Sequence, residues 1–153
     1  MTTTLLYLED FVPGQIFRHQ SDEIISADAI KQFAGTYDPQ PFHLDEAAAA
    51  LSFFGGLAAS GWHTAALTMQ LLVATLPIQG GIIGAGFEEL RWPRPTRPGD
   101  LLRLEVEVLE LKFSQSKPQH GFLKHRLTSF NQHDQAVLIM TGNLLVPRRP
   151  PVD

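Results

Sequence analysis

Two side chains that can exchange protons with a substrate lie close together in the first third of the chain. Asp38 and His43 occur in the stretch YDPQPFHLD, residues 37–45. A carboxylate is a base, and an imidazole gives or accepts a proton near neutral pH without a large change in its pKa. The two prolines between them restrict the backbone, so the pair can be held in one geometry. Asp38 can also simply open a turn and His43 can be a half-buried structural residue; residue types alone favour that interpretation.

A wider resemblance favours the catalytic interpretation. Residues 33–67 resemble the hydratase-2 motif of the MaoC-like dehydratases and R-specific enoyl-CoA hydratases. In order, the seven positions of that motif are an aromatic residue, Asp, any residue, a residue that is usually Asn, Pro, an apolar residue and His. Residues 37–43 read YDPQPFH. ASGWHT at residues 59–64 is similar to the start of the central helix in this family, and PTRPGD at residues 95–100 suits a turn before one of its strands. Gln40 departs from the motif, because it stands where Asn is usual.

The resemblance implies a reversible syn addition of water to a trans-2-enoyl-CoA, which gives an (R)-3-hydroxyacyl-CoA. Asp38 would be the principal base toward the water, with His43 as its hydrogen-bond partner and proton relay. The backbone N–H of Gly61, at a helix N-terminus, would stabilise charge on the thioester oxygen, and glycine would let the substrate come close. Ser60 is a candidate substrate contact, although its residue type favours capping the helix. Gln40 would orient the loop or a substrate carbonyl. No metal or organic cofactor is implied, and the coenzyme A thioester is the substrate.

Helices must position these residues. Ser26 fits an N-cap, and the helix expected at residues 27–36 carries its apolar side chains on one stripe. That helix must end before Asp38, because the following prolines cannot continue it. Asp45 is expected to cap a short Ala-rich helix. A helix at residues 61–76 is apolar on almost every face, so it must be surrounded by protein. Thr64 and Thr68 of this helix form one narrow polar line together with Ser60, which directly precedes the helix.

Strand patterns follow the apolar helix. Residues 82–92 read as one strand, and residues 102–113 alternate apolar with polar side chains. The alternation slips by one residue after Val108, which predicts a β-bulge. The other strands are expected at residues 15–25, 122–130 and 136–146. Five mostly antiparallel strands and one buried helix predict an α+β fold. Together with the motif, they indicate a single hotdog domain over residues 1–153, with a curved sheet wrapped around a long central helix.

The other chemically distinctive residues are assigned structural roles. His63 lies on the apolar helix and is expected in the core or at an interface. Trp62 and Trp92 are expected to pack. The arginines at positions 91, 94 and 97 are expected in solvent on a Pro-rich turn rather than on coenzyme A phosphates. The remaining histidines fall in strands or turns and are expected to face solvent: His19, His120, His125 and His133.

Composition limits the class of protein. The 153 residues are 18% charged and 44% hydrophobic, which is typical of one globular domain. The formal net charge of −4 and the lack of a basic stripe give no electrostatic case for binding nucleic acid or an anionic membrane. No cysteine is present, which excludes disulfides and thiolate chemistry. No signal peptide or membrane span is evident, so a cytoplasmic protein is expected.

Oligomeric state and function follow from the resemblance. The family pairs two subunits into a continuous sheet, so a homodimer or a larger homo-oligomer is expected. Two other functions suit the same segment: a hotdog thioesterase, which would direct water at the thioester carbonyl, and a non-catalytic acyl-CoA-binding protein. The placement of His43 five residues after Asp38 favours hydration. The acyl group can be straight, branched or dicarboxylic.

Overall fold

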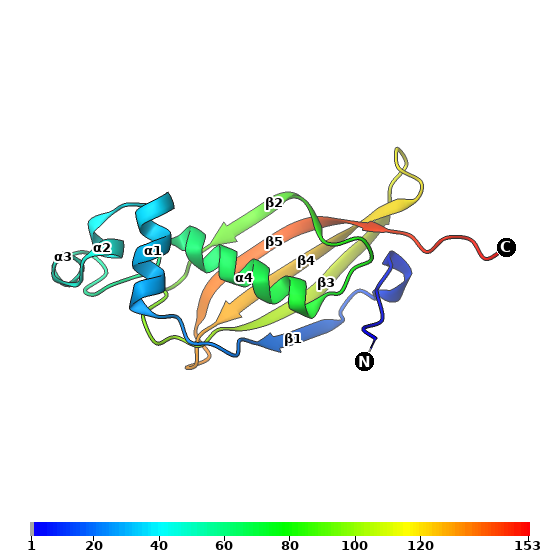
Figure 1. Ribbon diagram of the computed structural model, residues 1–153. Helices are drawn as coiled ribbons and strands as arrows, with labels where there is room; N and C mark the ends of the chain where they lie inside the picture. The colour runs from blue at the N-terminus through cyan, green and yellow to red at the C-terminus, as the bar shows by residue number, and fades with distance from the viewer. Residues whose placement is uncertain (1) are drawn as a thin grey trace.

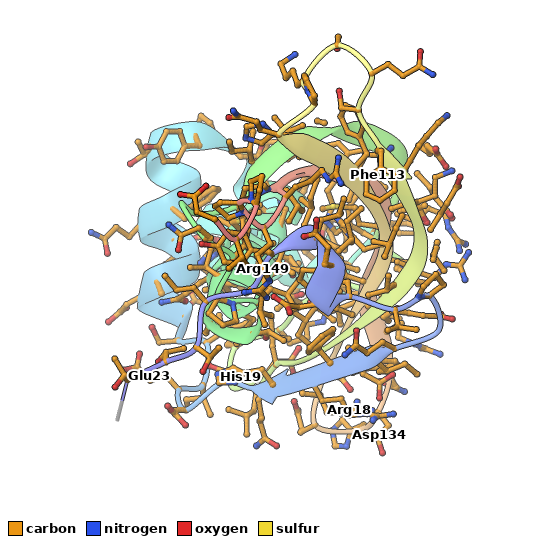
Figure 2. The ribbon with its side chains drawn as sticks, turned by 90° about the vertical axis from the view of Figure 1, so that its right-hand side faces the viewer. Arg18, His19, Glu23, Phe113, Asp134 and Arg149 are labelled. Atoms are coloured by element: carbon orange, nitrogen blue, oxygen red, sulfur yellow. The ribbon has the colours of Figure 1, made fainter. Side chains whose placement is uncertain are left out.

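The computed structural model describes residues 2–153, and its strands form one five-stranded antiparallel sheet. The order across the sheet is β1-β3-β4-β5-β2. The strands are β1 (Ile16–Gln20), β2 (Ile83–Arg91), β3 (Arg103–Phe113), β4 (His120–Phe130) and β5 (Ala136–Pro147). Helix α4 (Gly61–Thr75) lies along one face of the sheet (Figure 1). Viewed from the end near both termini, the strands curve around that helix (Figure 2). The expected α+β hotdog fold is confirmed.

Three short helices gather at the end of the sheet where α4 begins (Figure 1): α1 (Ala27–Tyr37), α2 (Pro41–Leu44) and α3 (Glu46–Ala50). Ser26 caps α1, because its hydroxyl accepts the Ala29 N–H at 3.0 Å. Asp45 caps α3, because its carboxylate accepts the Ala48 N–H at 2.7 Å. Both predicted caps are confirmed. A 3-10 turn, η1 (Leu8–Asp10), lies at the other end of the sheet beside the chain termini (Figure 1).

The predicted irregularity of β3 is present. The register of β3 against β4 shifts between Val108 and Glu110, as the slip in the apolar pattern indicates. The edge strand β2 carries two further shifts against β5, between Gly84 and Phe87 and between Phe87 and Glu89. The first of these shifts contains Gly86, whose φ of 114° is one that glycine adopts readily and other residues rarely do.

The solvent-facing position expected for His125 is wrong. His125 is 2% exposed and lies on β4 between the fully buried side chains of Leu123 and Leu127. Burial lowers the pKa of its imidazole to about 4, because the charged form loses its hydration. Position 125 is in phase with the apolar alternation of β4, and this pattern outweighs the general preference of histidine for partly exposed sites.

Helix α4 is only partly enclosed within one chain. Its inner side packs on the sheet through residues such as Leu72, which is 1% exposed. A stripe along its outer side stays open, with Trp62 59%, Met69 42% and Val73 56% exposed. The expectation that protein surrounds the whole helix is therefore wrong for a single chain, because one sheet covers only one side. No helix within residues 2–153 has the length and apolar character needed to cross a membrane.

Candidate active site

The predicted acid/base pair is in direct contact. Helix α1 ends at Tyr37, and Asp38 is its C-cap. Pro41 occupies the first turn of α2, where a missing N–H does no harm, and α2 carries His43. The loop predicted between the two residues thus contains a short helix. His43 Nε2 lies 3.2 Å from Asp38 Oδ2, and the two side chains are 5% and 20% exposed.

A backbone carbonyl fixes the tautomer of His43. The ring Nδ1 lies 2.6 Å from Ala58 O in a buried contact. A carbonyl oxygen only accepts hydrogen bonds, so Nδ1 must carry a hydrogen. The other ring nitrogen, Nε2, is thereby directed at the Asp38 carboxylate. At 3.2 Å from Asp38 Oδ2, His43 Nε2 is placed to share a proton with the carboxylate.

The Asp38 carboxylate is held in its ionised form. Partial burial acts to raise its pKa, but this is outweighed by the hydrogen bond from Gln40, the nearby Ser60 hydroxyl and the positive charge that His43 can carry. The pKa of Asp38 is therefore below its ordinary value. Gln40 Nε2 donates to Asp38 Oδ1 at 2.5 Å, so the longer side chain at this position reaches the carboxylate itself. The ionised Asp38 carboxylate can therefore act as a base, with the His43 imidazole as the group that exchanges the proton with it.

Ser60 is not the helix cap that its residue type suggested. It occupies the N-cap position of α4, but its side chain accepts no hydrogen bond from the helix. The residue is fully buried, and its hydroxyl lies outside hydrogen-bonding geometry with every described group. The hydroxyl is nevertheless close enough to the Asp38 carboxylate to lower the pKa of that group. Ser60 thus lies near Asp38 and does not cap α4.

Gly61 begins α4, and its N–H finds no acceptor among residues 2–153. It is available at the positive end of the helix dipole, as an oxyanion donor must be. The structure adds a packing reason for glycine to the expected one. A Cβ at this position would lie 2.8 Å from Trp92 Cε2, and Trp92 Nε1 donates to Gly61 O at 2.8 Å. Glycine is therefore required for the close packing of Trp92, whether or not a substrate approaches.

Arg97 holds the segment that orients His43, and this role was missed. Its guanidinium donates to the carbonyls of Gly56 at 2.8 Å and of Leu57 at 3.3 Å, and also to that of Phe54. Ala58, whose carbonyl accepts from His43, directly follows Leu57. The expectation that Arg97 is solvated is wrong, because the Pro-rich turn directs it inward onto three carbonyls. A carbonyl acceptor leaves no signal in residue types.

The predicted polar line of α4 is buried against neighbouring elements. Thr64 Oγ1 donates to Thr96 Oγ1 at 2.9 Å, and Thr68 Oγ1 lies 2.7 Å from Ser129 Oγ on β4. Thr96 also accepts the Ala59 N–H through its backbone carbonyl at 2.9 Å. These bonds fix the start of α4 relative to the turn that carries Arg97. Hydrogen bonds thus join the start of α4, which carries Gly61, to the turn that carries Arg97.

Aromatic rings cover His43. Phe42 meets its ring edge-on with centroids 4.6 Å apart, and Phe54 lies 6.2 Å away. Trp62 and Trp92 pack edge to face at 5.5 Å, as expected of packing residues, although both remain partly exposed. His63 is 7% exposed and stacks on Phe33, in line with the core position expected for it.

Known proteins with the same architecture match almost the whole chain. The family model described as MaoC like domain matches residues 10–128. The crystal structure of a MaoC-like dehydratase from Rhodospirillum rubrum is 52% identical, with a TM-score of 0.90 over 95% of this chain and 99% of that one. The structure of the unliganded R-hydratase PhaJ1 from Pseudomonas aeruginosa is 29% identical, with a TM-score of 0.72 over 96% and 95% of the two chains.

Two curated proteins are also similar in sequence. The uncharacterised protein YdeM of Bacillus subtilis is 35% identical over 141 residues, which cover 91% of this chain and 96% of that protein. The 3-hydroxybutyryl-CoA dehydratase of Methylorubrum extorquens is 36% identical over 107 residues, or 70% of this chain and 66% of that protein. With the family model matching well over half of its length, this chain belongs to the MaoC-like dehydratase domain family.

Proposed function

We propose that the chain catalyses the reversible addition of water to a trans-2-enoyl-CoA, giving an (R)-3-hydroxyacyl-CoA. The observation that carries this proposal is the His43 ring, which the Ala58 carbonyl turns so that Nε2 faces the Asp38 carboxylate at 3.2 Å. The names of two similar proteins, a 3-hydroxybutyryl-CoA dehydratase and an R-hydratase, support the same reaction class.

The residues would divide the reaction as follows. A water bound beside both Asp38 and His43 attacks Cβ, and Asp38 accepts the proton that the water loses. The electron pair of the double bond moves toward the thioester oxygen, where the N–H of Gly61 stabilises the developing charge. The pair then delivers one proton to Cα, so that water is added in full and both residues return to their starting state. Ser60 and Gln40 act on the orientation and ionisation of Asp38.

Hydration and hydrolysis are separated by one assay. Purified protein is mixed with crotonyl-CoA and longer enoyl-CoAs, and two signals are followed: loss of the conjugated double bond and release of free thiol. Hydration produces the first signal alone, with the (R)-alcohol as product. Thiol release without loss of the double bond would instead identify a thioesterase. Neither signal over the whole panel would support a non-catalytic acyl-CoA-binding protein.

Substitutions locate the reaction at the pair. Asp38→Asn keeps the side-chain shape and removes the base, so we expect turnover to fall by 10²-fold or more. The matched control is Asp28→Asn, which changes an exposed carboxylate in the first turn of α1. Equal activity of the two variants would remove Asp38 from the proposed site. Circular dichroism spectra of both variants check that the fold is kept.

We also propose that two copies associate through β2 and the open side of α4. Strand β2 is at the sheet edge and exposes Ile83 and Phe87, which are 51% and 59% exposed. An uncovered apolar strand edge is prone to pair with another strand. The exposed stripe of α4 adds a second apolar surface on the same chain. Light scattering after size exclusion should give twice the mass of the chain, 17.0 kDa, and a monomer at micromolar concentration would contradict this.

A further inference from the structure

A buried carboxylate, Asp100, lies in the turn that leads from β2 to β3 and takes no part in the proposed chemistry. It is 5% exposed and forms no ion pair within the described residues 2–153. A buried carboxylate is destabilising unless hydrogen bonds replace its lost hydration. Its two oxygens accept from the Arg97 N–H at 2.8 Å and from Gln132 Nε2 at 3.0 Å. Both oxygens are thus engaged, and the role of Asp100 follows from the groups that they hold.

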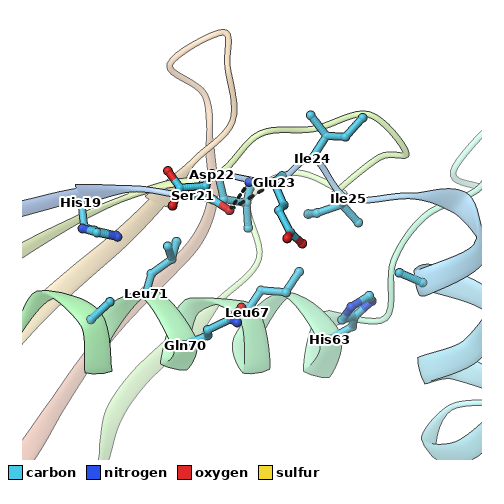
Figure 3. Close-up of a pocket in the computed structure, with 13 residues that line it drawn as sticks. His19, Ser21, Asp22, Glu23, Ile24, Ile25, His63, Leu67, Gln70 and Leu71 are labelled. Carbon is cyan, nitrogen blue, oxygen red and sulfur yellow. Dashed lines mark hydrogen bonds between the residues drawn. The ribbon is translucent and has the colours of Figure 1, made fainter.

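Two hydrogen bonds between Arg97 and Asp100 close the turn. The Arg97 N–H donates to the Asp100 carboxylate, and the Asp100 N–H donates to the Arg97 carbonyl at 3.1 Å. The turn is also joined to Ile25, because the Gly99 N–H donates to Ile25 O at 2.7 Å and the Ile25 N–H donates to Asp100 O at 2.9 Å. Ile25 ends the segment that leads from β1 toward α1 and faces α4 (Figure 3). The backbone of Arg97 is therefore fixed, which sets the direction of its side chain.

The side chain of Arg97 carries this restraint to the segment before α4. Its guanidinium donates to three carbonyls within residues 54–57. Ala58 follows directly, donates its N–H to Phe42 O at 3.1 Å, and accepts from His43 Nδ1 at 2.6 Å. A hydrogen-bonded path therefore runs from the buried carboxylate to the imidazole of the catalytic pair.

We propose that Asp100 is a positioning residue for His43 and acts through Arg97. Asp100 fixes Arg97, Arg97 fixes residues 54–57, and the Ala58 carbonyl that follows them holds the His43 ring with Nε2 toward Asp38. Asp100 has no place for a substrate contact in this path, so its loss should lower kcat and leave KM nearly unchanged. The effect on kcat rests on the proposed function, whereas the orientation of the ring does not.

The first measurement is the rate at which the His43 Nδ1–H exchanges with water, followed by NMR on protein with ¹⁵N-labelled histidine rings. The His43 signal is identified by its absence from the His43→Gln protein. Backbone amides of β4 are the internal reference, because they exchange when the sheet opens. Asp100→Ala should speed the ring exchange about three- to tenfold relative to these amides, as for the loss of one hydrogen bond. A variant that is only less stable would speed both to the same extent.

The second measurement is turnover of crotonyl-CoA, with a closely matched control. Asp10 also accepts the N–H of the residue three positions earlier, Tyr7, at 2.8 Å, but it lies in η1 at the other end of the sheet (Figure 1). Asp100→Ala should lower kcat about ten- to a hundredfold and change KM less than about twofold, and Asp10→Ala should change neither. Asp100→Asn keeps one oxygen for the Arg97 N–H and should recover most of kcat.

Unchanged ring exchange in the Asp100→Ala protein, relative to the β4 amides, would overturn the proposal. In an active enzyme, faster ring exchange without a loss of kcat would contradict it as well. If the unaltered chain hydrates no enoyl-CoA, the proposed function fails, and the exchange rates still decide the role of Asp100. Arg97→Lys keeps the charge but offers a single nitrogen to three carbonyls, so it should also speed the ring exchange. This variant decides the case if Asp100→Ala does not fold.

Discussion

The hydrogen bond from Gln40 to Asp38 gives the sharpest test of how the proposed base is kept ionised. Gln40 Nε2 donates to Asp38 Oδ1 at 2.5 Å, and this bond is one of the causes that lower the pKa of Asp38. Gln40→Leu keeps the approximate size of the side chain and removes the donor. The ionised form of Asp38 then loses a stabilising partner, so its pKa must rise toward its ordinary value.

The size of the change follows from the energy of the bond. A hydrogen bond to a charged acceptor contributes about 1.5–3 kcal/mol net, and Gln40→Leu removes this contribution from the ionised form of Asp38. The pKa of Asp38 therefore rises toward its ordinary value when this bond is removed. Because the ionised carboxylate is the form that accepts the water proton, the acid limb of activity moves to higher pH by the same amount.

The assay is kcat/KM for crotonyl-CoA as a function of pH, since this ratio reports ionisations of the free enzyme. Gln32→Leu, an exposed glutamine on α1, is the matched control and should leave the acid limb in place. Gln40→Asn shortens the side chain by one methylene, and we expect it to give an intermediate shift or none. A Gln40→Leu protein that is active with an unmoved acid limb would refute the role of Gln40 in keeping Asp38 ionised.

Three further predictions concern stability. Arg97→Met frees three carbonyls from a charged donor and should lower the free energy of unfolding by about 2–4 kcal/mol, measured by urea denaturation; a loss below about 0.5 kcal/mol would mean that the segment is held by other contacts. Gly61→Ala places a Cβ 2.8 Å from the Trp92 ring and should cost about 1–3 kcal/mol, and Trp92→Leu in the same chain should recover part of it. His125 has its pKa lowered from 6.5 to about 4, so the unfolded chain binds the proton first as pH falls. The free energy of unfolding should therefore fall by about 3 kcal/mol as the pH falls from 6.5 to 4. In the His125→Leu protein this part of the pH dependence should disappear.

Local patterns predicted most of the fold. The caps at Ser26 and Asp45 were found because a capping side chain acts on backbone within three residues of itself. The bulge after Val108 was found because a strand cannot change faces without an extra residue. His125 was in phase with its neighbours Leu123 and Leu127, so the same reasoning would have placed it correctly. The residue type of His125 favours a partly exposed site, and the periodicity of the strand outweighs that preference.

The site was predicted less completely, because part of it is backbone. The motif identified Asp38 and His43, and they are in contact. The Ala58 carbonyl that orients His43 has no side-chain signature, since every residue offers the same carbonyl. Arg97 acts at a distance of about 40 positions along the chain and through carbonyls only. Ser60 has the residue type of a cap and the position of a cap, and only the direction of its hydroxyl in space decides otherwise.

The apolar character of α4 carries an implication beyond one chain. A helix that is apolar all round has to be covered all round, and the sheet of a single chain leaves Trp62, Met69 and Val73 open. Trp62 directly follows Gly61, so whatever covers the open stripe also borders the N–H proposed to bind the thioester oxygen. Excluding water there strengthens that hydrogen bond, because the local dielectric falls. The proposed association of two copies would therefore also complete the surroundings of the Gly61 N–H, so a monomeric variant of the chain should lose activity together with the cover over α4.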